Sequence, residues 1–291
     1  MFRSLDKGQT VPPSLPSMGA TLLLRALLKR PHGAGAVPPA PLDSEFLVEA
    51  FDRADIERYN AALGFLKNSA PGAPPLTYYY LAVQRAHLVT MLAPAFPYRI
   101  AGMVHVENAL VLHGGQPRGP MRLSTRIDIL PPTGSGAVYC ALETEGRCGE
   151  ALVFTCTSTY LARRGKRRGG AAPAPADPGA AIAEWTLPPS AGRAYARVSG
   201  DWNPIHLARW TARLMGLREP IIHGMHSVGK AAAQLEQLSG RRGQHMSAIS
   251  VRFRAPIPLG ATVVLAQGTE PDTYALYCRG TLAAEGSFRL E

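Results

Sequence analysis

The sequence predicts an α+β protein built from two tandem repeats, each with helices followed by antiparallel strands. Three observations support this. The length of 291 residues allows two cores of ordinary size. A stretch rich in Gly, Ala and Pro divides the chain. The same order of helix and strand patterns occurs on both sides of it. We therefore expect an N-terminal extension (1–44), a first repeat (45–164), a linker (165–183) and a second repeat (184–291).

The second repeat begins with two helical patterns. Residues 207–217 form a short one, and a longer apolar helix follows. Its apolar residues recur at spacings of three and four: Ile222, Met225, Val228, Ala232 and Leu235. Strands are predicted within 247–268, 273–282 and 283–290, because residues such as Ile249, Val251 and Phe253 alternate with polar neighbours.

The first repeat has the same plan, with helices predicted over 54–65 and 74–94 and strands over 103–164. The segment HVENALVLHG (105–114) aligns with VRFRAPIPLG (251–260), and both end in Gly. The first copy has no counterpart of the Asp and His residues described below. We therefore expect the second repeat to carry the chemistry and the first to shape a pocket.

Composition limits the classes of function. A hydrophobic content of 46% with 18% charged residues is typical of a folded protein. The net charge is +10, and the run RRGKRR (163–168) contributes five cations. No recognition helix, aromatic RNA-binding motif or zinc module accompanies it, which disfavours nucleic acid as a partner. The run is then a solvated linker, or it attracts the phosphates of coenzyme A or an acidic acyl carrier protein.

The cysteines indicate a cytoplasmic protein, and the N-terminal segment indicates a helix without a membrane span. The four cysteines lie in apolar strand patterns without metal-binding spacing, which predicts reduced, buried thiols: Cys140, Cys148, Cys156 and Cys278. Near the N-terminus, the apolar segment 18–28 is short and interrupted by Arg25. It predicts an amphipathic helix that packs on the protein, with no stable membrane insertion. The alternative is an organellar transit peptide, because the N-terminus is poor in acidic residues.

The segment YARVSGDWNPIHLARW (195–210) places a carboxylate and an imidazole five residues apart. Asn203 followed by Pro204 predicts a helix start, with the Asn side chain as cap. His206 would then lie in the first helical turn, where the helix dipole disfavours a charged imidazole. Gly200 permits a tight approach of Asp201, so both side chains could hold one water molecule.

A second element, PIIHGMHS (220–227), places Gly224 at the start of the next helix. There a backbone N–H without an obstructing side chain can face a ligand oxygen. A carboxylate, a neutral histidine and an N–H donor are the groups needed to add water to, or remove it from, a bond conjugated to a carbonyl.

Together, YARVSGDWNPIH and PIIHGM resemble the MaoC-like hot-dog proteins, the (R)-specific 2-enoyl thioester hydratases and 3-hydroxyacyl thioester dehydratases. The close match covers residues 193–260. The resemblance implies a double hot-dog fold, in which each repeat wraps an antiparallel sheet around a long helix. It also implies a degenerate first copy beside a catalytic second copy.

The resemblance implies roles for individual residues. Asp201 and His206 would share the catalytic water, and the N–H of Gly224 would stabilise the thioester carbonyl. Gly200, Asn203 and Pro204 would support the site. His223, Met225 and Ser227 are candidates for the pocket, although a helix-surface position is the simpler expectation for Ser227. No cofactor is implied.

A zinc site built from His206, His223 and His226 is disfavoured, because no Cys or acidic residue completes a tetrahedron. We therefore expect no metal.

The leading hypothesis is a lyase that reversibly dehydrates a 3-hydroxyacyl thioester of coenzyme A or acyl carrier protein in fatty-acid metabolism. One alternative is a hot-dog thioesterase, but the central helix offers an acid only at Glu236. Another is a non-catalytic acyl-binding subunit, which the presence of Asp201 and His206 disfavours. Arg252, Arg254 and the 163–168 run are candidates for phosphate contact. Monomer and homodimer are both compatible with a double hot-dog chain.

Overall fold

The protein is described here as a computed structural model covering residues 11–31, 40–66, 73–114, 119–166, 180–239 and 244–291. Most of the predicted linker, and residues 167–168 of the basic run, lie outside these ranges. No helix in this part of the chain combines the length and the apolar composition of a membrane span.

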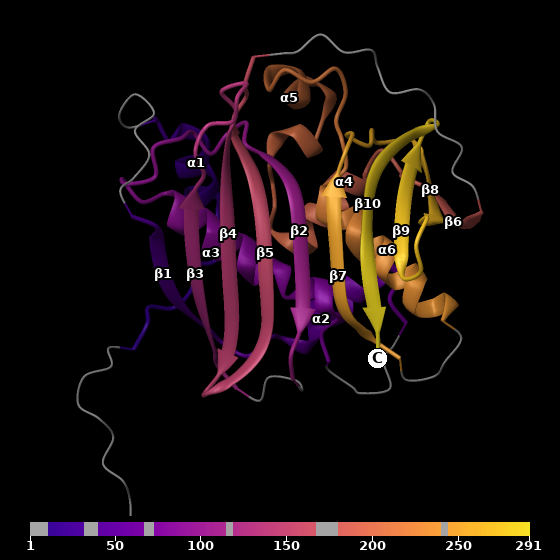
Figure 1. Ribbon diagram of the computed structural model, residues 1–291, viewed down its shortest axis with the longest axis horizontal. Helices are drawn as coiled ribbons and strands as arrows, with labels where there is room; N and C mark the ends of the chain where they lie inside the picture. The colour runs from indigo at the N-terminus through magenta and orange to yellow at the C-terminus, as the bar shows by residue number, and fades with distance from the viewer. Residues whose placement is uncertain (1–10, 32–39, 67–72, 115–118, 167–179, 240–243) are drawn as a thin grey trace, which may run out of the picture.

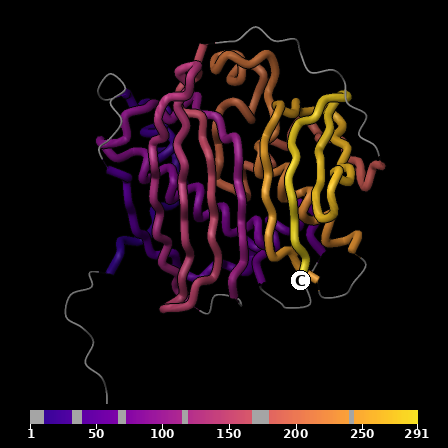
Figure 2. Tube along the Cα trace, viewed as in Figure 1, coloured from indigo at the N-terminus to yellow at the C-terminus, as the bar shows by residue number. Residues whose placement is uncertain are grey.

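Ten antiparallel strands of the described chain form one sheet, which crosses the whole molecule (Figure 1, Figure 2). The strands are β1 (Leu42–Val48), β2 (Val104–Leu112), β3 (Met121–Ile129), β4 (Val138–Cys148), β5 (Ala151–Arg163), β6 (Ala181–Thr186), β7 (Met246–Phe253), β8 (Thr262–Gln267), β9 (Thr273–Cys278) and β10 (Thr281–Leu290).

The strand order is β1-β3-β4-β5-β2-β7-β10-β9-β8-β6. When the strands are numbered by their order within each half, those of the first half lie in the sheet as 1-3-4-5-2. Those of the second half lie as 2-5-4-3-1, which is the mirror image. The two halves meet where β2 pairs with β7, with Glu107 opposite Arg252. The duplicated α+β fold predicted from the sequence is therefore confirmed.

The helices are α1 (Ala20–Leu28), α2 (Arg53–Leu63), α3 (Tyr80–Met91), α4 (Ala191–Ser199), α5 (Arg209–Leu214) and α6 (Gly224–Leu238), with short 3-10 turns η1 (Leu76–Tyr78) and η2 (Pro204–His206). The central helices α3 and α6 lie behind the sheet in Figure 1. Both contribute to one continuous core that also includes strands of both halves, with buried alanines such as Ala82, Ala86, Ala231 and Ala232. Small residues let the helices approach their neighbours closely.

The predicted order of helices first and strands afterwards is wrong in one respect. A strand precedes the helices in each half: β1 begins at Leu42, inside the predicted extension, and β6 begins at Ala181, inside the predicted linker. Both are edge strands with a single neighbour in the sheet. In β1 only Phe46 and Val48 are buried, so the apolar alternation is short.

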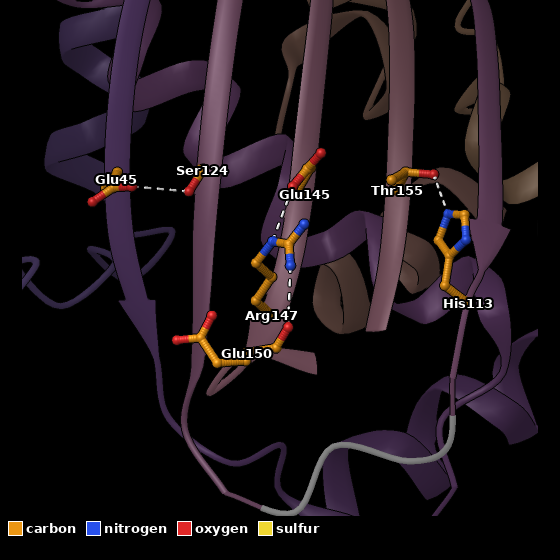
Figure 3. A network of polar contacts seen from close by, with 7 residues as sticks. All are labelled: Glu45, His113, Ser124, Glu145, Arg147, Glu150 and Thr155. Carbon is orange, nitrogen blue, oxygen red and sulfur yellow. Dashed lines mark hydrogen bonds and ion pairs between the residues drawn. The ribbon is translucent and has the colours of Figure 1, made fainter. Parts of the chain in front are cut away.

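The outer face of the first half is polar, whereas alternate residues of β3 and β4 are buried on the inner face. Figure 3 shows polar contacts on this outer face. Between strands, Ser124 Oγ donates to Glu45 Oε1 at 3.1 Å, and within β4, Arg147 Nε donates to Glu145 Oε2 at 3.1 Å. Exposed contacts of this kind add little stability each.

Two expectations about local structure have clear outcomes. The segment at 18–28 forms the helix α1, with Leu22 and Ala26 buried, as predicted. All four cysteines are thiols, and Cys140, Cys156 and Cys278 are buried. Cys148 is only half-buried, because it lies at the end of β4 next to a turn.

Candidate active site

Asp201 lies on a short loop after α4, and both halves of the protein hold its carboxylate. The helix ends at Gly200 in the left-handed conformation, with φ of 74°. Asp201 Oδ1 accepts the backbone N–H of Asn203 at 3.1 Å. Gln84 Nε2, from α3 of the first repeat, donates to Asp201 Oδ2 at 2.7 Å. Oδ1 is therefore held by the local turn, and Oδ2 is held by Gln84 of the first repeat.

His206 is the last residue of η2, and Asn203 caps this turn as predicted, through its side chain. The ring is 7% exposed. Burial and the nearby His223 lower the pKa of His206 to about 3, although Asp201 and the carbonyl of Ile221 act in the opposite direction. The expected cause, a helix dipole, is wrong because η2 has only three residues. The ring is neutral because it is buried.

The tautomer of His206 follows from its hydrogen bond. His206 Nδ1 lies 2.9 Å from the carbonyl oxygen of Ile221, which can only accept. Nδ1 therefore carries the proton, and Nε2 of the neutral ring presents a lone pair. This nitrogen is available as a base.

His223 packs directly against His206, with ring centroids 3.7 Å apart. His223 Nε2 donates to the backbone carbonyl of Asp201 at 2.9 Å. Its Nδ1 is buried and has no hydrogen-bond partner within the described residues. His223 therefore fixes the loop that carries Asp201 and covers one face of the His206 ring.

Asp201, His206 and His223 each offer one polar atom, and these three atoms lie within 4.8 Å of one another. Burial raises the pKa of the Asp201 carboxyl. The opposing effect of four neighbours is larger, so the net shift of this pKa is downward: His223, His206, Gln84 and Asn203. At neutral pH the pair is an ionised carboxylate beside a neutral imidazole.

The sequence-based reason against a metal was wrong in part, because it assumed that no acidic residue joins the histidines. Asp201 does join His206 and His223. His226, the third histidine of the zinc alternative, is instead packed edge-on against Tyr195, with ring centroids 5.3 Å apart.

Gly224 is the first residue of α6, as predicted. The first N–H groups of a helix have no intrahelical partner, so they can bind a ligand oxygen. A Cβ added at Gly224 would lie 2.7 Å from Cζ of Phe253. Glycine therefore lets this helix start pack closely against Phe253 of β7.

A cavity of about 480 Å³ joins these groups. Asp201, His206 and Gly224 line it, together with Asn203, Pro204 and the pocket candidates His223, Met225 and Ser227. Ser227 is 3% exposed, so its expected place on the helix surface is wrong. The reason is that α6 is a central helix, and most of the residues in its first two turns are buried.

The first repeat supplies much of the opposite wall, from one face of α3: Tyr80, Gln84, His87, Leu88 and Met91. Tyr80 Oη also contacts Tyr160 Oη at 2.8 Å. None of these five residues was predicted from the sequence as part of the site. One signal was available, since these five residues recur at the spacing of one helix face.

The arginines proposed for phosphate contact are engaged in ion pairs. Arg252 Nε donates to Glu107 Oε1 at 2.5 Å, and Arg254 Nε donates to Glu285 Oε1 at 2.8 Å. Arg254 also lines the cavity, as does the exposed Arg164 from the described start of the basic run. Among the described residues of these candidates, Arg254 and Arg164 line the cavity.

Comparison with known proteins groups part of this chain with one family. Residues 172–269 match the family described as MaoC like domain, a segment that includes Asp201, His206 and Gly224. Residues 172–269 are therefore similar to a MaoC-like domain, and the whole has the double hot-dog fold.

Relatives and solved structures extend the likeness over most of the chain. 3-Hydroxyacyl-thioester dehydratase X of Mycobacterium tuberculosis is 28% identical over 85% of this chain and 88% of its own length. The crystal structure of HtdX from that organism has a TM-score of 0.66 at 24% identity, over 84% of this chain and 99% of that chain. A MaoC-like dehydratase from Phytophthora capsici has a TM-score of 0.65 at 17% identity, over 89% and 98%.

A longer relative matches in part. Peroxisomal multifunctional enzyme type 2 of Mus musculus is 29% identical over 58% of this chain. The match covers 24% of that enzyme, and 31% of its Drosophila melanogaster namesake, so the chain corresponds to a fraction of these proteins.

Proposed function

We propose that the protein is a lyase that reversibly converts an (R)-3-hydroxyacyl thioester of coenzyme A or acyl carrier protein into the trans-2-enoyl thioester. The observation that carries this proposal is the convergence of three groups on one cavity: the Nε2 lone pair of His206, the carboxylate of Asp201 and the helix start at Gly224. The relatives named as 3-hydroxyacyl-thioester dehydratases support it.

The protonation states suggest how the reaction proceeds. The thioester carbonyl accepts a hydrogen bond from the N–H of Gly224, which stabilises negative charge on that oxygen. His206 Nε2 removes the proton from C2, and the C2–H electron pair forms the C2–C3 double bond as the C3–O bond breaks. The imidazolium returns the proton to the departing hydroxide, which leaves as water. Asp201 stays ionised, orients the hydroxyl and stabilises the imidazolium.

A thioesterase is the main alternative, and the position of Glu236 disfavours it. Glu236 follows Gly224 by twelve residues on α6, or about 18 Å along the helix. Its carboxylate accepts the backbone N–H of Met246 at 2.8 Å, and burial raises its pKa to about 7. Glu236 is absent from the described lining of the cavity.

The test is a hydration assay. The protein is mixed with crotonyl-CoA, and the loss of absorbance of the conjugated enoyl thioester is followed. A thiol reagent in a parallel sample measures free coenzyme A. Loss of the enoyl absorbance without thiol release supports the lyase, whereas thiol release supports the thioesterase. A failure of both signals with coenzyme A and acyl carrier protein substrates would leave the acyl-binding subunit.

Replacing Gln84 with Leu is expected to lower kcat for hydration about tenfold to a hundredfold, because a hydrogen bond to a charged group is lost. The Gln84 hydrogen bond lowers the pKa of Asp201. Its removal raises that pKa, so the acidic limb of the pH–rate profile moves to higher pH. The measurement is kcat against pH for wild type and variant.

The matched control is Gln267→Leu, which changes an exposed glutamine at the end of β8. Its profile should overlay that of wild type. A Gln84→Leu profile reduced equally at every pH would contradict the role in positioning and charging Asp201.

A further inference from the structure

The helix α1 lies outside the ten-stranded sheet and the two central helices, yet it lines the same cavity as the candidate active site. Leu23, Ala26 and Leu27 contribute to that lining, and Met18 does so just before the helix begins. Ala26 is 6% exposed and Leu27 is 40% exposed. Ala26 is therefore part of the inner wall, and Leu27 lies toward the rim.

Two contacts fix the direction of α1 along the cavity. At its N-terminal end, Met18 lies against Gly200: a Cβ added there would be 2.8 Å from Met18 Cβ, and Gly200 directly precedes Asp201. At its C-terminal end, Lys29 Nζ donates to the carbonyl of Ala93 at 2.7 Å and lies 5.7 Å from the ring centroid of Phe96. The helix thus runs from the catalytic loop to the segment that follows α3.

The central helix α3 extends along the same part of the cavity wall as α1. Gln84 binds the catalytic carboxylate, and Ala93 follows nine residues later, about 13 Å along a helix. The nine residues of α1 also rise about 13 Å, so the two helices flank the same stretch of the cavity. The preceding segment pairs with β1 through Leu15 N–H and the carbonyl of Leu47 at 2.8 Å, which anchors α1 to the sheet.

The lining between α1 and α3 changes character with distance from Asp201. It is polar at Gln84 and His87, and beyond them on α3 Leu88 and Met91 are apolar. Ile100 and Met103 add to this part, and both pack against a second core cluster that includes Met91 and Phe96. An apolar space that leads away from the reacting groups suits an aliphatic chain.

We propose that α1 is the wall that sets which acyl chain lengths the enzyme accepts, with Ala26 and Leu23 as the specificity-determining residues. This inference rests on the proposed function. The thioester carbonyl lies at Gly224, and the acyl chain extends along α3 toward Met91, with α1 on its other side. The side-chain size at positions 23 and 26 then limits the space for long chains.

The test compares full-length variants on trans-2-enoyl-CoA substrates of four, eight, twelve and sixteen carbons. Ala26→Phe places a large side chain in the cavity and should lower kcat/KM for the longest accepted chains about tenfold or more. The kcat/KM for the four-carbon substrate should change little. Leu23→Ala widens the space and should shift the preference toward longer chains. Leu24→Ala changes a leucine that is 55% exposed on the same helix and should match wild type.

Thermal melts show whether Ala26→Phe is folded, and Leu23→Ala keeps the test decisive if it is not. Equal losses at every chain length in a folded Ala26→Phe protein, or an unshifted preference in Leu23→Ala, would overturn the proposal. If wild type hydrates no substrate, the proposed function fails. Binding of the same acyl-CoA series, measured by calorimetry on the same variants, then decides the role of α1 separately.

Discussion

Replacing His206 with glutamine should lower kcat for enoyl-CoA hydration by about a thousandfold, within the range expected for a positioned general base. The variant keeps a side chain of similar size but loses the Nε2 lone pair that faces the cavity. Its KM should change much less, because the ring contributes mainly to the transition state. The measurement is steady-state hydration of crotonyl-CoA, with circular dichroism to confirm the fold.

Asp201→Asn should give a loss of similar size, because the variant removes the charge that stabilises the imidazolium. The two losses should not add in the double variant, since both residues act on the same proton. His113→Gln is the control, because His113 lies on the outer face of the sheet, where its ring contacts Thr155 (Figure 3). Wild-type rates in His206→Gln would refute the assignment of the base.

Gly192→Ala should damage stability and activity together. Gly192 is buried on α4, and a Cβ at this position would lie 1.9 Å from the backbone carbonyl oxygen of His206. Backbone atoms cannot rotate away, so α4 and η2 must separate. We expect a loss of about 1 to 3 kcal/mol in the free energy of unfolding and a fall in kcat, because His206 moves with its backbone. Denaturant melts and the hydration assay measure the two effects.

The control for this substitution is Gly134→Ala, because a Cβ at Gly134 meets no atom within 4 Å and its φ is not positive. That variant should unfold at the wild-type denaturant concentration. If Gly192→Ala did so as well, with full activity, the contact between α4 and the carbonyl of His206 would not constrain the site.

The sequence predicted the duplication and the positions of Asp201, His206 and Gly224, because these depend on local signals: apolar periodicity, an Asn–Pro helix start and a glycine before an apolar helix. It did not predict β1 and β6 as the first strands of each half, since edge strands have short apolar patterns. The reason predicted for the neutral state of His206, a helix dipole, was also wrong. Burial by packing elements is a tertiary property, whereas the dipole of a helix start can be inferred locally.

Gln84 shows a further limit of sequence reasoning. It is 117 residues away from Asp201 in the chain, and the hydrogen bond depends on how α3 packs against the loop that follows α4. The same is true of α1, whose sequence predicted an amphipathic helix but gave no sign of what it would cover. Contacts between distant segments follow from the assembled sheet, not from any single motif.

The mirrored strand order has a consequence for how such a protein can evolve. In a symmetric dimer of one short chain, a mutation that reshapes the substrate side of the cavity also alters the catalytic side, because the same gene encodes both. In a tandem chain, different segments encode the substrate side and the catalytic side of the cavity. Its first half can change to suit a substrate without altering the residues at Asp201 and His206, provided that it keeps Gln84 and the side chains that pack in the shared core.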